Sequence, residues 1–346
     1  MNYQKLILLL LIIFYGCKKN KIPTNKTLKE VKNTYDFVIA FGSCNNQNMV
    51  NNFWNTIDEN NPNIWIWGGD IIYSDTYDMI YLEKNYTQQK NNVEYQNFIK
   101  NKEILATWDD HDYGLNDGGI EYTKKKESQQ LFLDFLDVDK NDERRKQEGV
   151  YFAKSYSVNN TNIKIIALDT RYFRTELTPD TETKKRYQPN SYGRGSILGE
   201  TQWKWLEEQL KNSKANYHIL VSSIQFLSAE HGFESWGNMP HEVDKLEALL
   251  KSTQAKNTII LSGDRHISEF SKKEVDGLNY PLIDFTSSGL THSYSGFTEE
   301  PNIYRVGTVV SKKSFGLLKF NFNQNKVIFE IKGAANEVYQ TLTQNY

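Results

Sequence analysis

A series of short apolar runs, with helical patterns between several of them, is the feature of this sequence that most constrains its fold. The runs are rich in β-branched residues and cover 37–41, 64–67, 104–107, 163–168, 217–221, 258–261 and 281–285. Three stretches have helical spacing of apolar residues: "NMVNNFWNTIDEN", "ETQWKWLEEQL" and "DKLEALLK". In the first, one face is expected to carry Met49, Val50, Phe53, Trp54 and Ile57. Such alternation predicts an α/β protein with a buried sheet.

The C-terminal part has a different pattern. "FGLLKFNF" and "KVIFEIKG", joined by "NQN", predict a closing β-hairpin. No internal repeat and no low-complexity linker divides the chain, and about 310 residues are enough for one large core. Residues 36–346 are therefore predicted to form a single domain.

The N-terminus predicts export. Lys5 precedes the apolar stretch 6–14, which is shorter than the ~20 residues of a transmembrane helix and is typical of a signal peptide over residues 1–16. Cys17 follows directly after Gly16, and this arrangement resembles the lipobox of bacterial lipoproteins, in which the cysteine is acylated. We expect a polar tether over 17–35, a lipid anchor in the membrane, and a location in the bacterial cell envelope, either periplasmic or at the outer membrane and cell surface. A simple signal anchor is the alternative.

The charge of the chain excludes one class of partner. The net charge is −2, so no general basic field would recruit nucleic acid. We expect no specific nucleic acid partner and a monomeric protein.

Polar residues follow six of the apolar runs directly, in the motifs "GSC", "GGD", "WDDHD", "DTR", "SSIQ" and "SGDRH". Ligands of α/β proteins bind beyond the carboxyl ends of the strands, so this edge is expected to be an active site. Its ionisable and polar residues are Cys44, Asp70, Tyr73, Asp109, Asp110, His111, Asp112, Asn116, Asp264 and His266. So many carboxylates share one cleft only when cations neutralise them, which predicts more than one metal ion.

Each motif also has a structural interpretation. A lone Cys44 is often a small buried apolar residue, and Asp264 can cap a turn through backbone amides. The four consecutive titratable residues of "WDDHDYG" fit a structural role poorly. Structural roles for all six motifs would require six coincidences at one edge, so a functional site is preferred.

The ordered motifs carry a family resemblance from about residue 36 to residue 330. The set "GSCNNQ", "WIWGGDIIYSD", "ATWDDHDYGLND", "LDTRYFR", "LGETQWKWLEEQL", "ESWGNMPHEVDKLEALL" and "LSGDRHISEF" closely resembles the alkaline phosphatase D (PhoD-like) family of the calcineurin-like metallophosphoesterases. The resemblance implies an α/β fold of the αββα sandwich type that holds a metal cluster. It also implies a phosphoric ester hydrolase acting on phosphomonoesters or phosphodiesters.

The resemblance implies a ferric site. Asp70 would bridge two metals, because one carboxylate has two oxygens. Tyr73, three residues later, would be a tyrosinate ligand as in the similar purple acid phosphatases. Cys44 and His266 would complete the site, and bonding to iron would protect the Cys44 thiolate from oxidation.

The second site implied by the resemblance is richer in oxygen. Asp110 and Asp264 stand where related enzymes have an asparagine and a histidine, and Asp109 and Asn116 can add oxygen ligands. Oxygen in place of nitrogen shifts the preference from zinc toward calcium or magnesium. The expected cofactors are Fe3+ and Ca2+, with Zn2+, Mn2+ or Mg2+ as alternatives.

The implied reaction is attack of a metal-activated water or hydroxide on the phosphorus of a phosphate ester. Arg171 is predicted to grip a phosphate oxygen, with a structural pairing to an aspartate as the alternative. His111 is predicted to protonate the leaving group or to steady the nucleophile. His231 and His241 lie in a stretch that could form a rim on the substrate side.

Two other functions remain open at this point. Phosphodiester cleavage of the phospholipase D type would use the same site residues. A non-catalytic surface lipoprotein that binds glycan or metal fits the predicted anchor and the aromatic content, with 21 Tyr and 7 Trp, but it does not require the acidic cluster.

Overall fold

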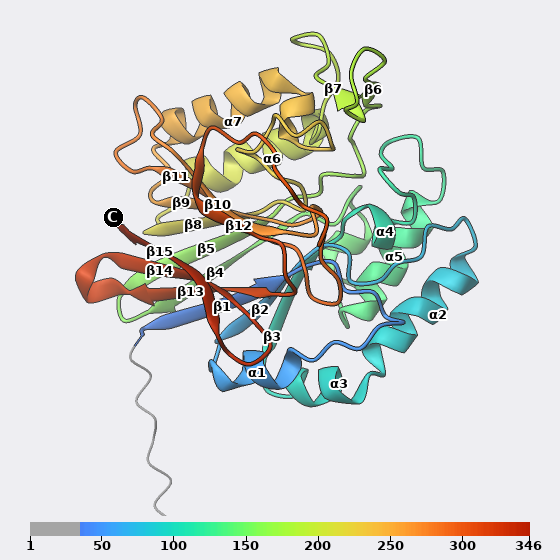
Figure 1. Ribbon diagram of the computed structural model, residues 1–346, viewed down its shortest axis with the longest axis horizontal. Helices are drawn as coiled ribbons and strands as arrows, with labels where there is room; N and C mark the ends of the chain where they lie inside the picture. Colours follow the sequence, from blue (N-terminus) through green and yellow to red (C-terminus); the bar gives the residue numbers. More distant parts are fainter. Residues whose placement is uncertain (1–34) are drawn as a thin grey trace, which may run out of the picture. The chain divides into compact units, whose positions relative to one another are not determined.

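Two β-sheets pack face to face at the centre of the molecule, and helices cover both outer faces (Figure 1). The computed structural model describes residues 35–346, which form one compact unit. The predicted signal peptide over 1–16, Cys17 and all but the last residue of the predicted tether over 17–35 lie outside the described residues.

The first sheet joins both ends of the described chain. Its strand order is β15 (Val338–Asn345), β14 (Lys326–Lys332), β13 (Phe315–Asn321), β1 (Phe37–Gly42), β2 (Ile64–Gly68) and β3 (Glu103–Thr107). The strands β1, β2 and β3 run parallel, whereas β13 pairs with β1 in the antiparallel direction, with Phe37 opposite Phe320.

The second sheet has a parallel centre and antiparallel borders. Its order is β12 (Arg305–Val310), β10 (Ser268–Lys273), β11 (Leu282–Ser287), β9 (Thr258–Ser262), β8 (Tyr217–Val221), β5 (Thr161–Ala167) and β4 (Phe152–Val158). The parallel strands are β11, β9, β8 and β5. A separate small hairpin consists of β6 (Thr178–Pro179) and β7 (Tyr187–Gln188).

The alternation of side chains along β1 shows how the layers form. Phe37, Ile39 and Phe41 point into the core between the two sheets, whereas Val38 and Ala40 belong to the core under the helices of the first sheet. All five side chains are buried, so the strand is apolar on both faces. This is the reason that the strand appears in the sequence as a continuous apolar run.

The helices divide between the two outer faces. The first sheet is covered by α1 (Trp54–Glu59), α2 (Met79–Lys90), α3 (Val93–Ile99) and α5 (Lys125–Phe135), and the short α4 (Asp110–Tyr113) follows β3. The second sheet is covered by α6 (Gly199–Lys211) and α7 (Pro240–Thr253). Short 3-10 turns lie at Glu143–Arg145, Trp236–Asn238 and Phe322–Gln324. Among residues 35–346, no helix combines the length and the apolar character that crossing a membrane requires.

Most sequence-based predictions of elements are confirmed, and one helix is shorter than predicted. All seven predicted strands form, and the predicted C-terminal hairpin is β13 and β14, extended by a third strand, β15. The predicted helical face that included Met49 and Val50 is wrong, because these side chains are 47% and 72% exposed and α1 begins at Trp54. The Asn51 side chain accepts from Phe53 N at 2.9 Å, a local turn that competes with a helix.

Candidate metal centre

The six predicted strand ends meet at one edge, which the two sheets share equally. Three strands come from the first sheet (β1, β2 and β3) and three from the second (β5, β8 and β9). Thr107 Oγ1, at the end of β3, donates to Leu168 O beyond β5 at 2.6 Å. A Cβ on Gly263, just after β9, would lie 2.5 Å from Ser43 Oγ, so only glycine permits this approach.

A sulfur, a carboxylate, a phenol and an imidazole converge at this edge. Asp70 Oδ2 lies 3.2 Å from Cys44 Sγ and 3.2 Å from Tyr73 Oη. Tyr73 Oη lies 3.0 Å from His266 Nε2. Ligand atoms of Cys44, Asp70 and His266 lie within 4.8 Å of one another. The structure therefore brings together the four residues predicted for the ferric site.

The backbone at this edge adopts an unusual conformation. Cys44, Asp70, Asp264 and His266 have φ angles of 60°, 50°, 67° and 54°. A left-handed conformation is uncommon for residues other than glycine, and strain of this kind concentrates at functional sites. The folded chain therefore holds these four side chains in place against a local conformational preference.

Two further groups of ligands adjoin the first. One contains Asp70, Asp110 and His111, and the other contains Asp109, Asp110 and Asp264, each with ligand atoms within 4.8 Å of one another. Asp70 and Asp110 each belong to two groups, so the three groups form one continuous cluster.

The cluster contains buried carboxylate oxygens that lack hydrogen-bond partners, and such oxygens indicate whether the cluster can bind cations. Among the described residues, Asp70 Oδ1 and Asp109 Oδ2 are buried and accept no hydrogen bond. Burying a carboxylate oxygen without a partner destabilises the folded protein, and a bound cation would remove this cost. The thiol, phenol, imidazole and carboxylate donors therefore fit a site for more than one metal.

The electrostatics of the protein groups lead to the same conclusion. Burial raises the pKa of Cys44 to about 11 and that of Asp264 to about 7, and it raises the pKa of Asp70 well above the usual range, with further contributions from nearby negative groups. Cations among these groups would favour their charged forms and so oppose these shifts.

The chain around "WDDHD" fixes the acidic residues through hydrogen bonds. Asp109 and Asp112 form a reciprocal capping box at the start of α4, in which Asp109 N donates to Asp112 Oδ1 at 2.6 Å. Asp112 Oδ2 also accepts from Ile71 N at 3.0 Å, which ties the turn after β2 to α4. Asp112 therefore positions the cluster.

Asp110 and His111 are neighbours that shift each other's pKa in opposite directions. Burial alone would raise the pKa of Asp110, but His111, Arg171 and backbone amides lower it to about 2. Burial alone would lower the pKa of His111, but Asp110, Asp70 and Asp75 raise it to about 11. The His111 ring is held by Asp75 Oδ2, 2.7 Å from Nδ1, and by Tyr73, with 4.1 Å between ring centroids.

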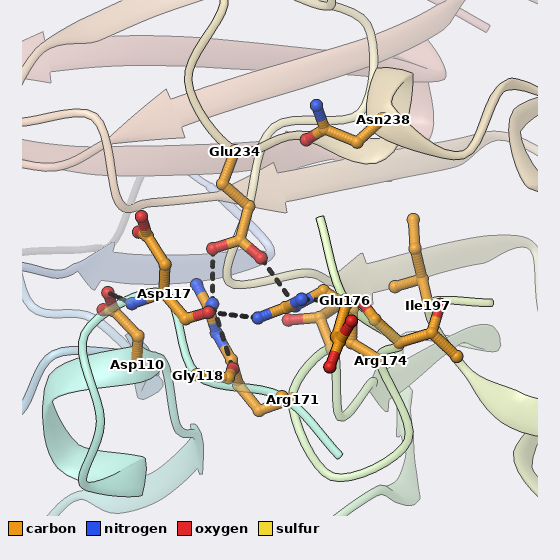
Figure 2. Close-up of polar contacts among 12 residues, drawn as sticks. Asp110, Asp117, Gly118, Arg171, Arg174, Glu176, Ile197, Glu234 and Asn238 are labelled. Atoms are coloured by element: carbon orange, nitrogen blue, oxygen red, sulfur yellow. Dashed lines mark hydrogen bonds and ion pairs between the residues drawn. The ribbon is translucent and has the colours of Figure 1, made fainter. Parts of the chain in front are cut away.

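Arg171 lies behind the cluster, where its side chain contacts two carboxylates. Its side chain is fully buried, Nε donates to Asp109 Oδ1 at 2.6 Å, and Nη1 contacts Glu234. Glu234 also pairs with Arg174 Nε at 2.8 Å, and Figure 2 shows Glu234 between the two arginines. The pairing with an aspartate, which was the alternative interpretation of Arg171, is present, and a contact with phosphate stays a prediction.

A cavity of about 310 Å³ opens beside the cluster. Its lining consists of Asp110, His111, Asn116, Asp117, Arg186, Phe233, Glu234, Asp264, Arg265, His266 and Tyr294. His231 and His241 are not part of this lining, although their stretch supplies Phe233 and Glu234. His231 is buried, and its Nδ1 accepts from Phe233 N at 3.0 Å. The predicted rim is therefore formed by neighbours of these histidines.

Several residues at the site were missed by sequence reasoning. Ser288 Oγ lies 3.0 Å from Cys44 Sγ and accepts from His266 N at 2.8 Å. The His292 ring lies 4.4 Å from that of His266. A polar run after the strand 282–287, "SGLTHS", was the available signal, because it follows the same strand-end rule.

The two stacked sheets, the helices on both faces and the donor cluster at the shared edge define an α/β-sandwich metalloprotein. The sequence matches the PhoD-like phosphatase family over residues 38–338. The chain therefore belongs to the PhoD-like phosphatase family, and the predicted family and fold class are confirmed.

The individual relatives have low sequence identity to this chain. Alkaline phosphatase D of Bacillus subtilis (strain 168) is 27% identical over 117 residues, which are 32% of this chain and 20% of that protein. The solved structure of PhoD superposes with a TM-score of 0.71 at 15% identity and covers 90% of this chain and 69% of that chain.

Two further structures share the fold. A dimetal phosphatase from Danio rerio has a TM-score of 0.52 at 13% identity, covering 90% of this chain and 99% of that one. A Plasmodium protein described as the anchor in the inner membrane complex has a TM-score of 0.56 at 13% identity, covering 89% and 88%. Likeness at such low identity shows the fold alone.

Proposed function

We propose that this protein is a metal-dependent phosphoester hydrolase. Asp70 carries the proposal. Its Oδ2 contacts the thiol and the phenol, its buried Oδ1 has no partner among the described residues, and it belongs to two of the three ligand groups. This is the placement expected of a carboxylate that bridges two cations. Family membership supports the same class of reaction.

The residues proposed to hold the cations are those of the cluster. Cys44, Asp70, Tyr73 and His266 would hold a ferric ion, and Ca2+ would be held by Asp70, Asp109, Asp110, Asn116 and Asp264. Zn2+, Mn2+ or Mg2+ are the alternatives. Bound cations would acidify a water molecule and neutralise charge on phosphate oxygens.

We propose that His111 delivers a proton to the leaving oxygen. Its Nδ1 is engaged by Asp75, and its ring packs on Tyr73, so the direction of Nε2 is fixed. It lines the cavity, and a proton held at Nε2 is available to a substrate lying there. Burial raises the pKa of Asp109, and Arg171 opposes this rise and holds the carboxyl group in place from behind through the Nε contact.

The test replaces Asp70 and follows both turnover and metal content. Asp70→Ala is expected to lose hydrolysis of 4-nitrophenyl phosphate and of bis(4-nitrophenyl) phosphate at neutral to alkaline pH, together with bound metal, while remaining folded. The control is Asp58→Ala, an exposed aspartate in α1 that pairs with Lys102. A near-normal rate in Asp70→Ala would refute the two-metal proposal. The two substrates also separate monoesterase from phospholipase D-type diesterase activity, and a protein that binds metal but cleaves neither would support the non-catalytic alternative.

We further propose that Cys17 is acylated and that the protein is a monomer attached to a membrane of the cell envelope. The short apolar stretch 6–14 and the cysteine that follows it support this. Each buried CH2 of an acyl chain contributes ~0.8 kcal/mol, so several chains give firm attachment. Cys17→Ser should move the protein from the membrane fraction to the soluble fraction or block its maturation. Native protein found only in the soluble fraction would contradict the proposal.

A further inference from the structure

The small hairpin of β6 and β7 places one arginine at the wall of the cavity. The hairpin lies apart from the two large sheets (Figure 1). Arg186 N and Tyr187 N both donate to Gly232 O, at 3.0 and 2.8 Å. This attachment holds the hairpin beside Phe233 and Glu234, which line the cavity.

The guanidinium of Arg186 is held at one nitrogen. Its Nη2 lies 2.7 Å from Asp117 Oδ2 and, with the Asn116 amide oriented to satisfy its neighbours, 3.1 Å from Asn116 Oδ1. Within residues 35–346, Nε and Nη1 of Arg186 have no hydrogen-bond partner, and the side chain is 50% exposed. One edge of the guanidinium group is therefore held by Asp117 and Asn116, and the other edge is available to bind an anionic group of a ligand.

The partner of Arg186 is itself tied to the candidate metal centre. Tyr187 Oη donates to Asp117 Oδ2 at 2.5 Å, and Asp117 N donates to Asp110 Oδ2 at 2.7 Å. Figure 2 shows Asp117 beside Asp110. Arg186 thus contacts Asn116, a proposed metal ligand, directly, and it is linked to a second one, Asp110, through Asp117.

The other arginine of the cavity wall, Arg265, is buried, with 7% of its surface exposed. Arg265 Nη2 donates to both carboxylate oxygens of Glu300, at 2.8 and 3.0 Å. Its guanidinium lies 4.0 Å from the centre of the Phe233 ring, where it supports an aromatic side chain that is 37% exposed. Arg265 Nε is buried and has no partner among residues 35–346, so of the two cavity-lining arginines Arg186 is the one whose free nitrogens belong to a half-exposed side chain.

We propose that Arg186 selects substrates by binding an anionic oxygen, of a carboxylate or a second phosphate, on the leaving-group part of the ester. This inference rests on the proposed function. A phosphate placed against the cluster directs the rest of the substrate into the cavity, past Arg186. Phosphate esters of alcohols that carry a negative charge are the substrate class that this arrangement favours.

The test compares two esters that differ by one charge. Rates of hydrolysis of 4-carboxyphenyl phosphate and phenyl phosphate are measured with the wild type, with Arg186→Gln, and with the control Lys184→Gln, which removes an exposed charge two residues away from Arg186. The ratio of kcat/KM for 4-carboxyphenyl phosphate to kcat/KM for phenyl phosphate should fall about 10-fold in Arg186→Gln, because a charge-assisted hydrogen bond to the carboxylate is lost. It should not change in the control. An equal loss of kcat/KM for both esters, which a purely structural role of Arg186 predicts, would overturn the proposal.

A binding measurement separates this inference from the proposed reaction. Affinities of the metal-loaded protein for 4-carboxybenzylphosphonate and benzylphosphonate are compared by calorimetry, which needs no turnover. A preference of the wild type for the charged compound that disappears in Arg186→Gln supports the inference even if neither ester is hydrolysed. If the wild type shows no preference, the role of Arg186 is wrong, and the assignment as a hydrolase is unaffected.

Discussion

Replacing Glu234 with glutamine should destabilise the protein strongly, although the side chain keeps its size. Glu234 is buried between Arg171 and Arg174, and Asp109 is the second carboxylate that contacts Arg171. The four groups thus form a buried set of two guanidinium groups and two carboxyl groups. Burial raises the pKa of Asp109, and the contact with Arg171 opposes this rise. Burial raises the pKa of Glu234, whereas the two guanidinium groups lower it. With two cations in direct contact, we take it as charged at neutral pH.

The size of the effect follows from the burial of this set. Glu234→Gln leaves two buried guanidinium groups with one carboxylate. Removing one partner of a buried ion pair costs about 3–5 kcal/mol, because the remaining charge is uncompensated. The matched control is Glu330→Gln, which breaks the pair of Lys319 and Glu330, whose side chains are 14% and 13% exposed. Because this pair is partly accessible to water, which screens its charges, its loss should cost less than the loss of a partner in the fully buried set.

Urea unfolding of the metal-free proteins measures both variants. A shift in the midpoint at constant slope reports the change in stability. The double variant Arg171→Met with Glu234→Leu leaves one cation and one anion, and it should recover part of the loss, with a coupling energy of about 0.5–3 kcal/mol. A loss for Glu234→Gln no larger than that for Glu330→Gln would refute the reasoning, since the four charges would then be solvated or neutralised in the folded protein.

Four further outcomes are expected. A ferric ion bound by Tyr73 and Cys44 should absorb visible light, so Tyr73→Phe should shift or bleach the band and Cys44→Ala should reduce the iron content; active protein with zinc and no band would contradict this. Chelators of hard ions should stop hydrolysis while leaving much of the colour, and added Ca2+ should restore the rate; failure of Ca2+ where Zn2+ succeeds would exclude calcium. Gly263→Ala should lower activity and stability because its Cβ would lie 2.5 Å from Ser43 Oγ, and an unchanged melting temperature would contradict the contact. Burial lowers the pKa of His218 from 6.5, so the unfolded chain binds a proton at His218 more readily than the folded chain does. The contribution of neutral His218 to stability is therefore present above pH 6.5 and is lost as the pH falls through the pKa of the folded state. Thermal melts should show that the wild type loses more stability than His218→Gln between pH 7.5 and pH 5.

The continuous apolar runs in the sequence correspond to strands with buried residues on both faces, such as β1. The run 37–41 is apolar at every position because each face of β1 meets a core. The strand β4 was missed because "FAKSYSV" alternates and its side chains are half-buried or exposed. The helix α2 was missed because its buried face includes the polar Asn85 and Gln89 beside Leu82 and Tyr86. Apolar periodicity identifies an element only where the core that it meets is apolar.

The sequence predicted the candidate metal ligands but not the residues that hold these ligands in place. Cys44, Asp70, Tyr73 and His266 converge because each follows a strand that ends at the same edge. The second carboxylate partner of Arg171, in contrast, is Glu234, which lies 63 positions along the chain in an irregular loop. Such a pairing depends on how the two sheets pack together, and no local pattern in the sequence predicts it.

The pairing of β1 with β13 has a consequence for how the molecule is made. The first strand of the described chain lies between β2, its near neighbour in sequence, and a strand that begins at Phe315. Until that segment has been synthesised, β1 has one open edge and its sheet is incomplete. Contacts of such long sequence separation form slowly, and exposed strand edges pair readily with other chains. Because Cys44 and Asp70 follow β1 and β2, the metal-binding edge should become rigid only at the end of folding, and metal added to a refolding chain should be captured in the slowest phase.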